Sequence, residues 1–376
     1  MPRITVAAGK HDRLFVPVSA EVAAGAGGVR LVDQESQREV PFQASADGKR
    51  IAWIVDNLAA GQTRAYELGP GAAAALGGGV ALQQVDGSRV EVRIGGEFFT
   101  AYHFGSDWSR PFLYPVIGPY GASVTRHYPM KEVEGERTDH PHHRSIFSAF
   151  GDVNGVNDWA DVRDYGRIVT NTFRALEQGP VYGAIRVNSS WESHSGEKLL
   201  GETRDIVIYN VPSAGRVVDY DLVLTAVNGD VTFGDTKEGG ILGVRVASSM
   251  DAARGGRIEN SYGGVDEKET WGKRAEWCDY SGPVEGKWIG ITVMDHPLSF
   301  RYPTYWHVRD YGLMTTNMFG LSAFYSDPSR RGEHTLKNGE SLSFRYRIYI
   351  HRGDAAEGGV GAKYHDFISP PVVTVA

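Results

Sequence analysis

Hydrophobic and polar residues alternate along much of the chain, as in β-strands that bury one face and expose the other. Valine and isoleucine alternate with arginine and glutamate over residues 89–94, and Gly95-Gly96 then predicts a hairpin turn into residues 97–103. The same two-residue period runs through residues 218–226 and 344–350. Long alternating strands of this kind indicate large antiparallel sheets that pack face to face.

Helical periodicity is clear only over residues 362–368, so the crossover helices that a parallel α/β fold requires are missing. Five shorter strands are predicted near the N-terminus, at 13–18, 28–33, 40–44, 50–55 and 64–68. A stretch rich in glycine and alanine follows them, as expected for a linker. We therefore expect an all-β protein with a small β-sandwich domain (1–68), a linker (69–79), and a large antiparallel two-sheet sandwich domain, supersandwich-like, that carries the site (80–376).

Composition narrows the class of protein. With 376 residues, 41% of them hydrophobic and 23% charged, the chain is typical of a folded protein of about two domains. The net charge of −7 and the lack of a Lys/Arg run argue against nucleic acid or an anionic membrane as the partner. Cys278 is the single cysteine and residues 1–6 lack an apolar signal core, so we expect a cytoplasmic protein without an internal disulfide.

The densest chemistry lies in the segment Asp139-His140-Pro141-His142-His143-Arg144. Proline favours an extended residue before it, and residues i and i+2 of an extended segment face the same side, so His140 and His142 are expected to point together. Two imidazoles on one side begin a site for a divalent metal. The third ligand would come from a distance, from His103, Glu238, His296 or His307. Without a metal, the three histidines would bind a sugar hydroxyl or a carboxylate, or only pack.

Three further segments carry candidate groups. Asn154 and Trp159 lie close together in the chain and could bind the hydroxyls and the ring of a sugar, although an Asx turn explains the same pattern. Lys237 and Glu238 supply an amine for an oxyanion and a carboxylate for a base, or else a solvated ion pair. Residues 306–311 combine tryptophan, histidine, arginine, aspartate and tyrosine, a density that favours a functional loop.

Two segments of the chain resemble each other. The sequence Val-Arg-Asp-Tyr-Gly occurs at 162–166 and again at 308–312, each time after a tryptophan and downstream of an Asp-His-Pro triplet. A duplicated half, with two equivalent loops at one cleft, would explain the repetition. A recurrent turn chemistry without a shared site would explain it too.

Seven segments together carry a family resemblance: 110–126, 139–144, 151–155, 236–239, 277–283, 295–297 and 306–312. Over about residues 85–352 the chain resembles a bacterial family of uncharacterised proteins labelled "methane oxygenase PmoA". Members accompany sugar oxidoreductases and carbohydrate catabolism, so the resemblance implies a sugar substrate. The label itself implies a membrane protein, and no apolar run in this chain reaches the roughly 20 residues of a membrane span.

Together these observations predict a carbohydrate-active enzyme, a lyase or hydrolase that removes a proton from an oxidised (3-keto) sugar or glycoside and cleaves a C–O bond. A mutarotase-like epimerase and a non-catalytic sugar-binding protein are the alternatives, and the oxygenase label taken literally would require bound copper or iron. The chain has no phosphate-binding loop and no dinucleotide fingerprint, so no nucleotide cofactor is expected. The expected partners are a small carbohydrate and further copies of the chain in a homo-oligomer.

The expected roles divide the candidate residues into three groups. Catalytic roles fall to His143, Lys237, Glu238 and His307. Substrate contacts are expected from Arg126, Arg144, Asn154, Trp159, Trp306, Arg309 and Tyr311. A divalent metal, where one takes part, is expected on His140, His142 and His296.

Overall fold

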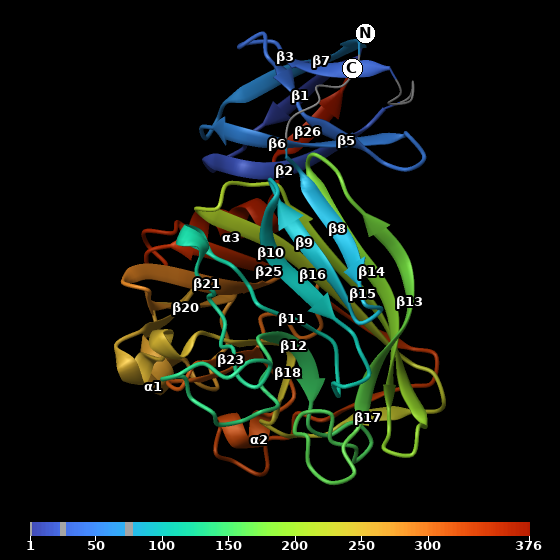
Figure 1. Ribbon diagram of the computed structural model, residues 1–376, viewed down its shortest axis with the longest axis vertical. Helices are drawn as coiled ribbons and strands as arrows, with labels where there is room; N and C mark the ends of the chain where they lie inside the picture. Colours follow the sequence, from blue (N-terminus) through green and yellow to red (C-terminus); the bar gives the residue numbers. More distant parts are fainter. Residues whose placement is uncertain (1, 23–27, 72–77) are drawn as a thin grey trace.

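The computed structural model describes residues 2–22, 28–71 and 78–376. About 50% of the residues are in strands and 7% in helices, which confirms the all-β class. Two eight-stranded sheets form a large domain, and two smaller sheets form a second domain at one end of it (Figure 1). No helix within the described ranges is long and apolar enough to cross a membrane.

The large domain consists of two antiparallel sheets, which we call sheet I and sheet II. Sheet I contains, in spatial order, β22 (Trp306–Arg309), β23 (Leu313–Thr316), β18 (Gly239–Arg245), β12 (Ile146–Phe150), β11 (Phe112–Leu113), β10 (Glu97–His103), β9 (Arg89–Ile94) and β8 (Val80–Val85). Sheet II contains β13 (Arg167–Glu177), β14 (Tyr182–Glu192), β15 (Lys198–Tyr209), β16 (Gly215–Ala226), β25 (Ser341–Arg352), β21 (Lys287–Asp295), β20 (Trp277–Val284) and β19 (Arg257–Asn260). A short pair, β17 (Val231–Phe233) and β24 (His334–Leu336), lies outside both sheets.

The two sheets share one hydrophobic core between their facing sides. Val92 of β9 and Leu222 of β16 belong to the same buried cluster, because the alternation in each strand sends its apolar residues inward. The expected strands over 218–226 and 344–350 lie inside β16 and β25. The predicted hairpin at Gly95-Gly96 joins β9 to β10, and both glycines have positive φ, the conformation that favours glycine. The two-sheet sandwich is therefore confirmed.

The small domain is built from both ends of the chain. Its five-stranded sheet contains β26 (Val372–Val375), β1 (Arg3–Ala7), β7 (Thr63–Pro70), β3 (Val29–Asp33) and β4 (Glu39–Val40), and its three-stranded sheet contains β2 (Arg13–Glu21), β6 (Arg50–Leu58) and β5 (Phe42–Ala44). The C-terminal strand β26 pairs with β1, whereas the sequence placed these residues in the large domain. Such a pairing joins opposite ends of the chain and leaves no local signal. The expected linker begins inside β7, and residues 72–77 of it lie outside the described residues.

Helices are few and short: α1 (Asp266–Thr270), α2 (Leu321–Phe324), α3 (Val360–Ile368), and the 3-10 turns η1 (Pro119–Gly121), η2 (Ser248–Met250) and η3 (Ala252–Arg254). The helix predicted at 362–368 is confirmed as α3. It packs with Tyr349 of β25 and Val217 of β16 in a cluster separate from the main core. The helix therefore covers the face of sheet II that points away from sheet I.

The two similar sequence segments have different structures. Val162 lies in a loop and is 51% exposed, whereas Val308 lies in β22 and is fully buried. A duplicated half would place equivalent residues in equivalent environments. The repetition is therefore one of sequence and not of local fold.

Trp53 tests the core of the small domain. It is fully buried and makes an edge contact with Tyr66 at 5.4 Å between ring centres. We expect Trp53→Ala to lower the free energy of unfolding by about 3–5 kcal/mol, because it removes a large buried ring and leaves a cavity. Trp288→Ala is the matched control, since Trp288 is 39% exposed and should cost well under half as much. Urea unfolding followed by circular dichroism measures both, and equal losses would contradict the proposed core.

Candidate active site

The histidine-rich segment lies on the face of sheet I that points away from sheet II. Neighbouring residues of β11 show this: Leu113 belongs to the core between the sheets, and Phe112 to a second cluster on the opposite face. The same second cluster contains Trp159, which contacts His142 and His143 at 5.7 and 5.0 Å between ring centres. The turn that precedes β12 thus places its histidines on the outer face of the sheet.

This segment is a tight turn and not the extended strand expected from its proline. His140 has a positive φ of 45°, and the amide of His143 donates to the carbonyl of His140 at 3.0 Å. Despite the turn, the rings of His140 and His142 lie close, with their centres 5.7 Å apart. The ring of His143 stacks on that of His140 at 4.8 Å. We call these three residues the histidine cluster.

A buried arginine determines the shape of the turn. The guanidinium of Arg126 donates to the carbonyls of Asp139 at 2.8 Å and His140 at 2.9 Å, and to the Asp139 carboxylate at 2.8 Å. Arg126 has no exposed surface. Burial, followed by the charge of Arg245, lowers the pKa of Arg126 to about 10, so it stays protonated at neutral pH.

The Asp139 carboxylate links the arginines to the histidine cluster. Its Oδ1 accepts hydrogen bonds from Arg126 and Arg245, both at 2.8 Å, and its Oδ2 accepts one from Nδ1 of His140 at 2.8 Å. Burial acts to raise the pKa of Asp139, but Arg245, the His140 bond and Arg126 outweigh it and lower the value. With Nδ1–H bound to a carboxylate, His140 keeps a free lone pair on Nε2, and its side chain is 40% exposed.

The other two histidines of the cluster are neutral. Burial, together with the charge of Arg110, lowers the pKa of His142 to about 3. Burial also lowers the pKa of His143 well below its ordinary value. Nδ1 of His143 accepts from Arg245 at 3.1 Å, which puts its proton on Nε2, and this buried atom has no partner among the described residues. Both imidazoles can exchange hydrogen bonds without carrying a charge.

Strand β22 and the loop after it bring a second group of residues to the site. Tyr311 stacks on His140 at 5.1 Å, with an angle of 5° between the rings. The guanidiniums of Arg245 and Arg309 lie over Tyr311 at 5.0 and 5.3 Å from the ring centre. Arg309 also forms an ion pair with Glu267 at 2.8 Å. Tyr311 therefore contacts a histidine ring and two guanidinium groups.

Lys237 and Glu238 border the same area. Their side chains form an ion pair at 3.3 Å and are both nearly half exposed. Burial raises the pKa of Tyr311, and the charge of Glu238 adds to this rise. Burial lowers the pKa of His307 to about 3, with contributions from Arg309 and Lys237. Nδ1 of His307 accepts from the indole of Trp271 at 3.0 Å, so His307 is a neutral imidazole with its proton on Nε2.

Several expected substrate contacts lie inside the protein. Trp306 is fully buried and donates from its indole to the carbonyl of Ala275 at 3.0 Å. Trp159 is 2% exposed and packs beneath the cluster, so neither indole is open to stack on a sugar. Arg144 is buried against Ser109 and Asp161. A sequence shows that an indole or a guanidinium is present, but the burial of that group depends on residues distant in the chain.

Two further assignments differ from expectation. Asn154 is exposed but exchanges hydrogen bonds with the backbone of Thr232, so it holds a loop in place. His296 packs against Phe367 of α3 at 4.9 Å, on the outer face of sheet II. The whole sandwich separates it from His140 and His142, so His296 cannot complete a metal site with them. Burial lowers the pKa of His296 to about 4, together with Arg345 and Arg347.

Other residues of the site were not expected from sequence. Arg245 ends β18, a strand that is otherwise apolar or glycine, and a lone arginine there is the one signal that could have marked it. Trp271 and Glu267 come from the α1 segment, and only the fold brings them to His307 and Arg309. Asp158 is 1% exposed, and burial raises its pKa to about 8, so this carboxyl is largely protonated at neutral pH.

A family model matches residues 89–365, which cover the whole of this site. The chain belongs to DUF6807, a family of unknown function. Because this family has no assigned activity, the sugar chemistry expected from the resemblance is still a prediction. No curated protein matches this DUF6807 member.

Solved structures of two bacterial proteins share the fold of this DUF6807 protein. A glycosyl hydrolase family 38 protein and an alpha-mannosidase, both from Enterococcus faecalis, superpose with TM-scores of 0.51 and 0.50 at 9% identity. Each match covers 100% of this chain and 47% or 46% of the enzyme, so the chain spans about half their length. An aldose epimerase homologue from C. elegans reaches a TM-score of 0.30 at 6% identity, over 73% of this chain and 99% of its own.

The buried state of His307 predicts a pH effect on stability. Its pKa is about 3 in the folded protein and roughly 6.5 when unfolded, so the unfolded chain takes up the proton first as the pH falls. The neutral ring therefore stabilises the fold fully above pH ~6.5, and this contribution is lost progressively towards pH ~3. His307→Gln keeps an acceptor for Trp271 but does not titrate. We expect wild-type stability to fall more steeply than the variant's from pH ~6.5 to ~4, by up to about 1.4 kcal/mol per unit.

Urea unfolding at several pH values measures this difference. His194→Gln is the matched control, because the His194 side chain is 68% exposed, and it should leave the wild-type slope unchanged. Equal slopes for wild type and His307→Gln would show that His307 is not held neutral by burial.

Proposed function

We propose that this protein is a carbohydrate-active enzyme that removes a proton from an oxidised (3-keto) sugar or glycoside and cleaves a C–O bond, as a lyase or, after addition of water, a hydrolase. The observation that carries the proposal is the Asp139–His140 pair. A carboxylate that receives Nδ1–H leaves Nε2 as a proton acceptor, and the His140 side chain is 40% exposed and stacks on Tyr311. The fold shared with two sugar-cleaving enzymes supports a sugar as the substrate.

The proposed reaction begins at the carbon next to the ketone. Nε2 of His140 takes the proton from C2, and the electron pair left on C2 forms a double bond to C3, so that the ketone oxygen becomes an enolate. The enolate then re-forms the ketone, a C1–C2 double bond appears, and the C1–O bond breaks with its electrons on the leaving oxygen. The His140 imidazolium returns its proton to that oxygen. Atoms and charge balance, and Asp139 stabilises the imidazolium between the two steps.

The residues around His140 can stabilise the negative charge that develops on the ketone oxygen. The enolate oxygen needs a donor that is fixed before the reaction, and the ammonium of Lys237, which is nearly half exposed, is the candidate at this edge of the site. Arg245 and Arg309 add positive charge around Tyr311. Glu238 is the alternative base, because its carboxylate is nearly half exposed beside the same tyrosine. His143 would orient His140 from beneath by stacking.

The described residues give less support to a divalent metal in this site than to the Asp139–His140 pair. Among residues 2–22, 28–71 and 78–376, no three His, Cys, Asp or Glu side chains are grouped so as to hold an ion. The donor set therefore does not fit a metal, and no step of the proposed reaction uses one.

Replacement of His140 tests the proposal. We expect His140→Asn to reduce elimination from a 3-keto-glycoside at least about 100-fold, because the base is lost, while the melting temperature stays near that of the wild type. His296→Asn is the matched control, since it removes a histidine on the opposite side of the sandwich and should retain activity. NMR of the 3-keto-glycoside with purified protein follows both the loss of the C2 proton and the release of the leaving group.

The same measurement separates the alternatives. An epimerase would exchange protons and leave the C–O bond intact, and a sugar-binding protein would bind the glycoside without change. Full activity in His140→Asn would show that the Asp139–His140 pair takes no part in the reaction. Full activity only with added divalent metal, and its loss on chelation, would contradict the metal-free reaction.

A further inference from the structure

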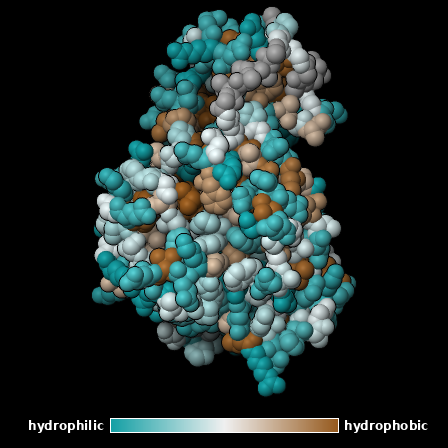
Figure 2. Space-filling view, viewed as in Figure 1, coloured by the Kyte–Doolittle hydropathy of each residue, from teal (hydrophilic) through white to brown (hydrophobic). Residues whose placement is uncertain are grey.

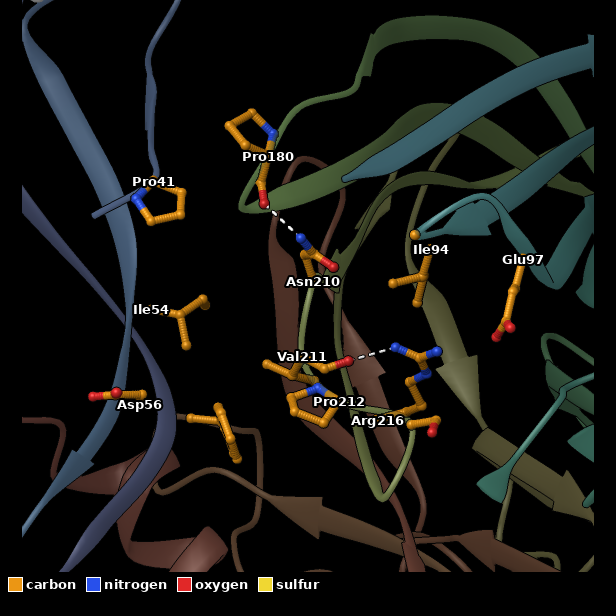
Figure 3. Close-up of a pocket in the computed structure, with 13 residues that line it drawn as sticks. Pro41, Ile54, Asp56, Ile94, Glu97, Pro180, Asn210, Val211, Pro212 and Arg216 are labelled. Atoms are coloured by element: carbon orange, nitrogen blue, oxygen red, sulfur yellow. Dashed lines mark hydrogen bonds between the residues drawn. The ribbon is translucent and has the colours of Figure 1, made fainter. Parts of the chain in front are cut away.

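A cavity of about 490 Å³ lies at the junction of the small and large domains, apart from the histidine cluster. Strands β2 and β6 of the small domain form one wall, and the large domain forms the other through the β9–β10 turn, the β15–β16 loop and β16. Its lining residues include Phe15, Ile54, Ile94, Asn210, Pro212 and Arg216. Figure 3 shows side chains from both domains facing this space, and Figure 2 shows hydrophobic residues gathered just below the small domain. Domain junctions are common places for small-molecule sites, and this volume lies in their usual range.

Arg216 is the one cation among the lining residues, and it is buried. The residue is 8% exposed, and its Nη1 donates to the carbonyl of Val211 (Figure 3). Within the described residues this is the only hydrogen bond of the guanidinium, and no carboxylate forms an ion pair with it. Burial lowers the pKa of Arg216. The other donors of this guanidinium have no protein partner among the described residues and are not enclosed by protein, so they are open to a ligand in the cavity.

The rest of the lining limits what this ligand can be. Ile54 of the small domain faces Ile94 and Pro212 of the large domain (Figure 3), and Phe15 also lines the cavity, so there is space for an apolar body. The amide nitrogen of Asn210 is occupied by the carbonyl of Pro180 at 2.8 Å.

Two carboxylates lie among the lining residues as well. Asp56 is paired with Arg64, and Glu97 is exposed near Arg216. A ligand with one negative charge satisfies Arg216, and a ligand with several would be repelled by these two acids.

We propose that the cavity binds a small organic monocarboxylate, with its carboxylate on Arg216 and its apolar body between the walls of the two domains. Arginine binds carboxylates through parallel, charge-assisted hydrogen bonds, and Arg216 has the free donors to do so. Because the ligand would touch both domains, its binding would also stabilise their junction. This site does not depend on the reaction proposed for the histidine cluster.

Phenylacetate and phenylacetamide test the proposal, because they share a shape and differ in charge. We expect isothermal titration calorimetry with the full chain to detect phenylacetate and to find phenylacetamide at least about tenfold weaker. Arg216→Gln should weaken phenylacetate binding by about ten- to a hundredfold. Glu97→Gln is the matched control in the same cavity, and it should leave phenylacetate binding unchanged or strengthen it, since a nearby negative charge is removed.

Ile54→Trp provides a second test that does not alter the charge. The larger side chain fills the apolar part of the cavity from the small-domain side, so it should abolish phenylacetate binding even where Arg216→Gln folds poorly. Equal binding of acid and amide, equal binding to wild type and Ile54→Trp, or no phenylacetate binding at millimolar concentration would each overturn the proposal.

Discussion

The buried guanidinium of Arg126 holds together the turn on which the candidate site is built. It donates hydrogen bonds of at most 2.9 Å to the carbonyls of Asp139 and His140 and to the Asp139 carboxylate. His140 has a left-handed backbone, a conformation that costs a non-glycine residue energy unless its surroundings compensate. Loss of one partner from a buried charge pair typically costs about 3–5 kcal/mol, so this one side chain can outweigh that strain. The shape of this turn sets the positions of all three histidines of the cluster.

The charges around the turn determine what each histidine can do. Arg126 and Arg245 share a single carboxylate, Asp139, and this leaves the surroundings of the cluster positive. Burial and the charge of Arg110 disfavour a positive charge on His142, and burial with the charges of Arg245 and Arg126 disfavours one on His143, so both rings are neutral. His140 differs because its Nδ1 proton is bound by the carboxylate. His140 can therefore accept a proton, whereas His142 and His143 can only donate and accept hydrogen bonds.

Sheet I brings the remaining residues of the site together through the order of its strands. The strands β22, β23, β18 and β12 are adjacent in space but come from three distant parts of the chain. Arg245 lies at the end of β18, Lys237 and Glu238 just before it, and His307 in β22. Both ends of the chain also meet in the small domain, where the C-terminal strand β26 pairs with the N-terminal strand β1 in the five-stranded sheet (Figure 1).

The sequence by itself determined the all-β class, the long strands, the hairpin at Gly95-Gly96 and the helix near the C-terminus, because a two-residue or helical period is a local property of the chain. It also marked the histidine-rich segment by its density of chemistry. Only the tertiary structure decided that Trp306 is buried, that His296 lies across the sandwich, and that Arg245 meets Asp139. Burial and contact depend on residues far apart in the chain, such as Asp139 and Arg245, and no local pattern records them.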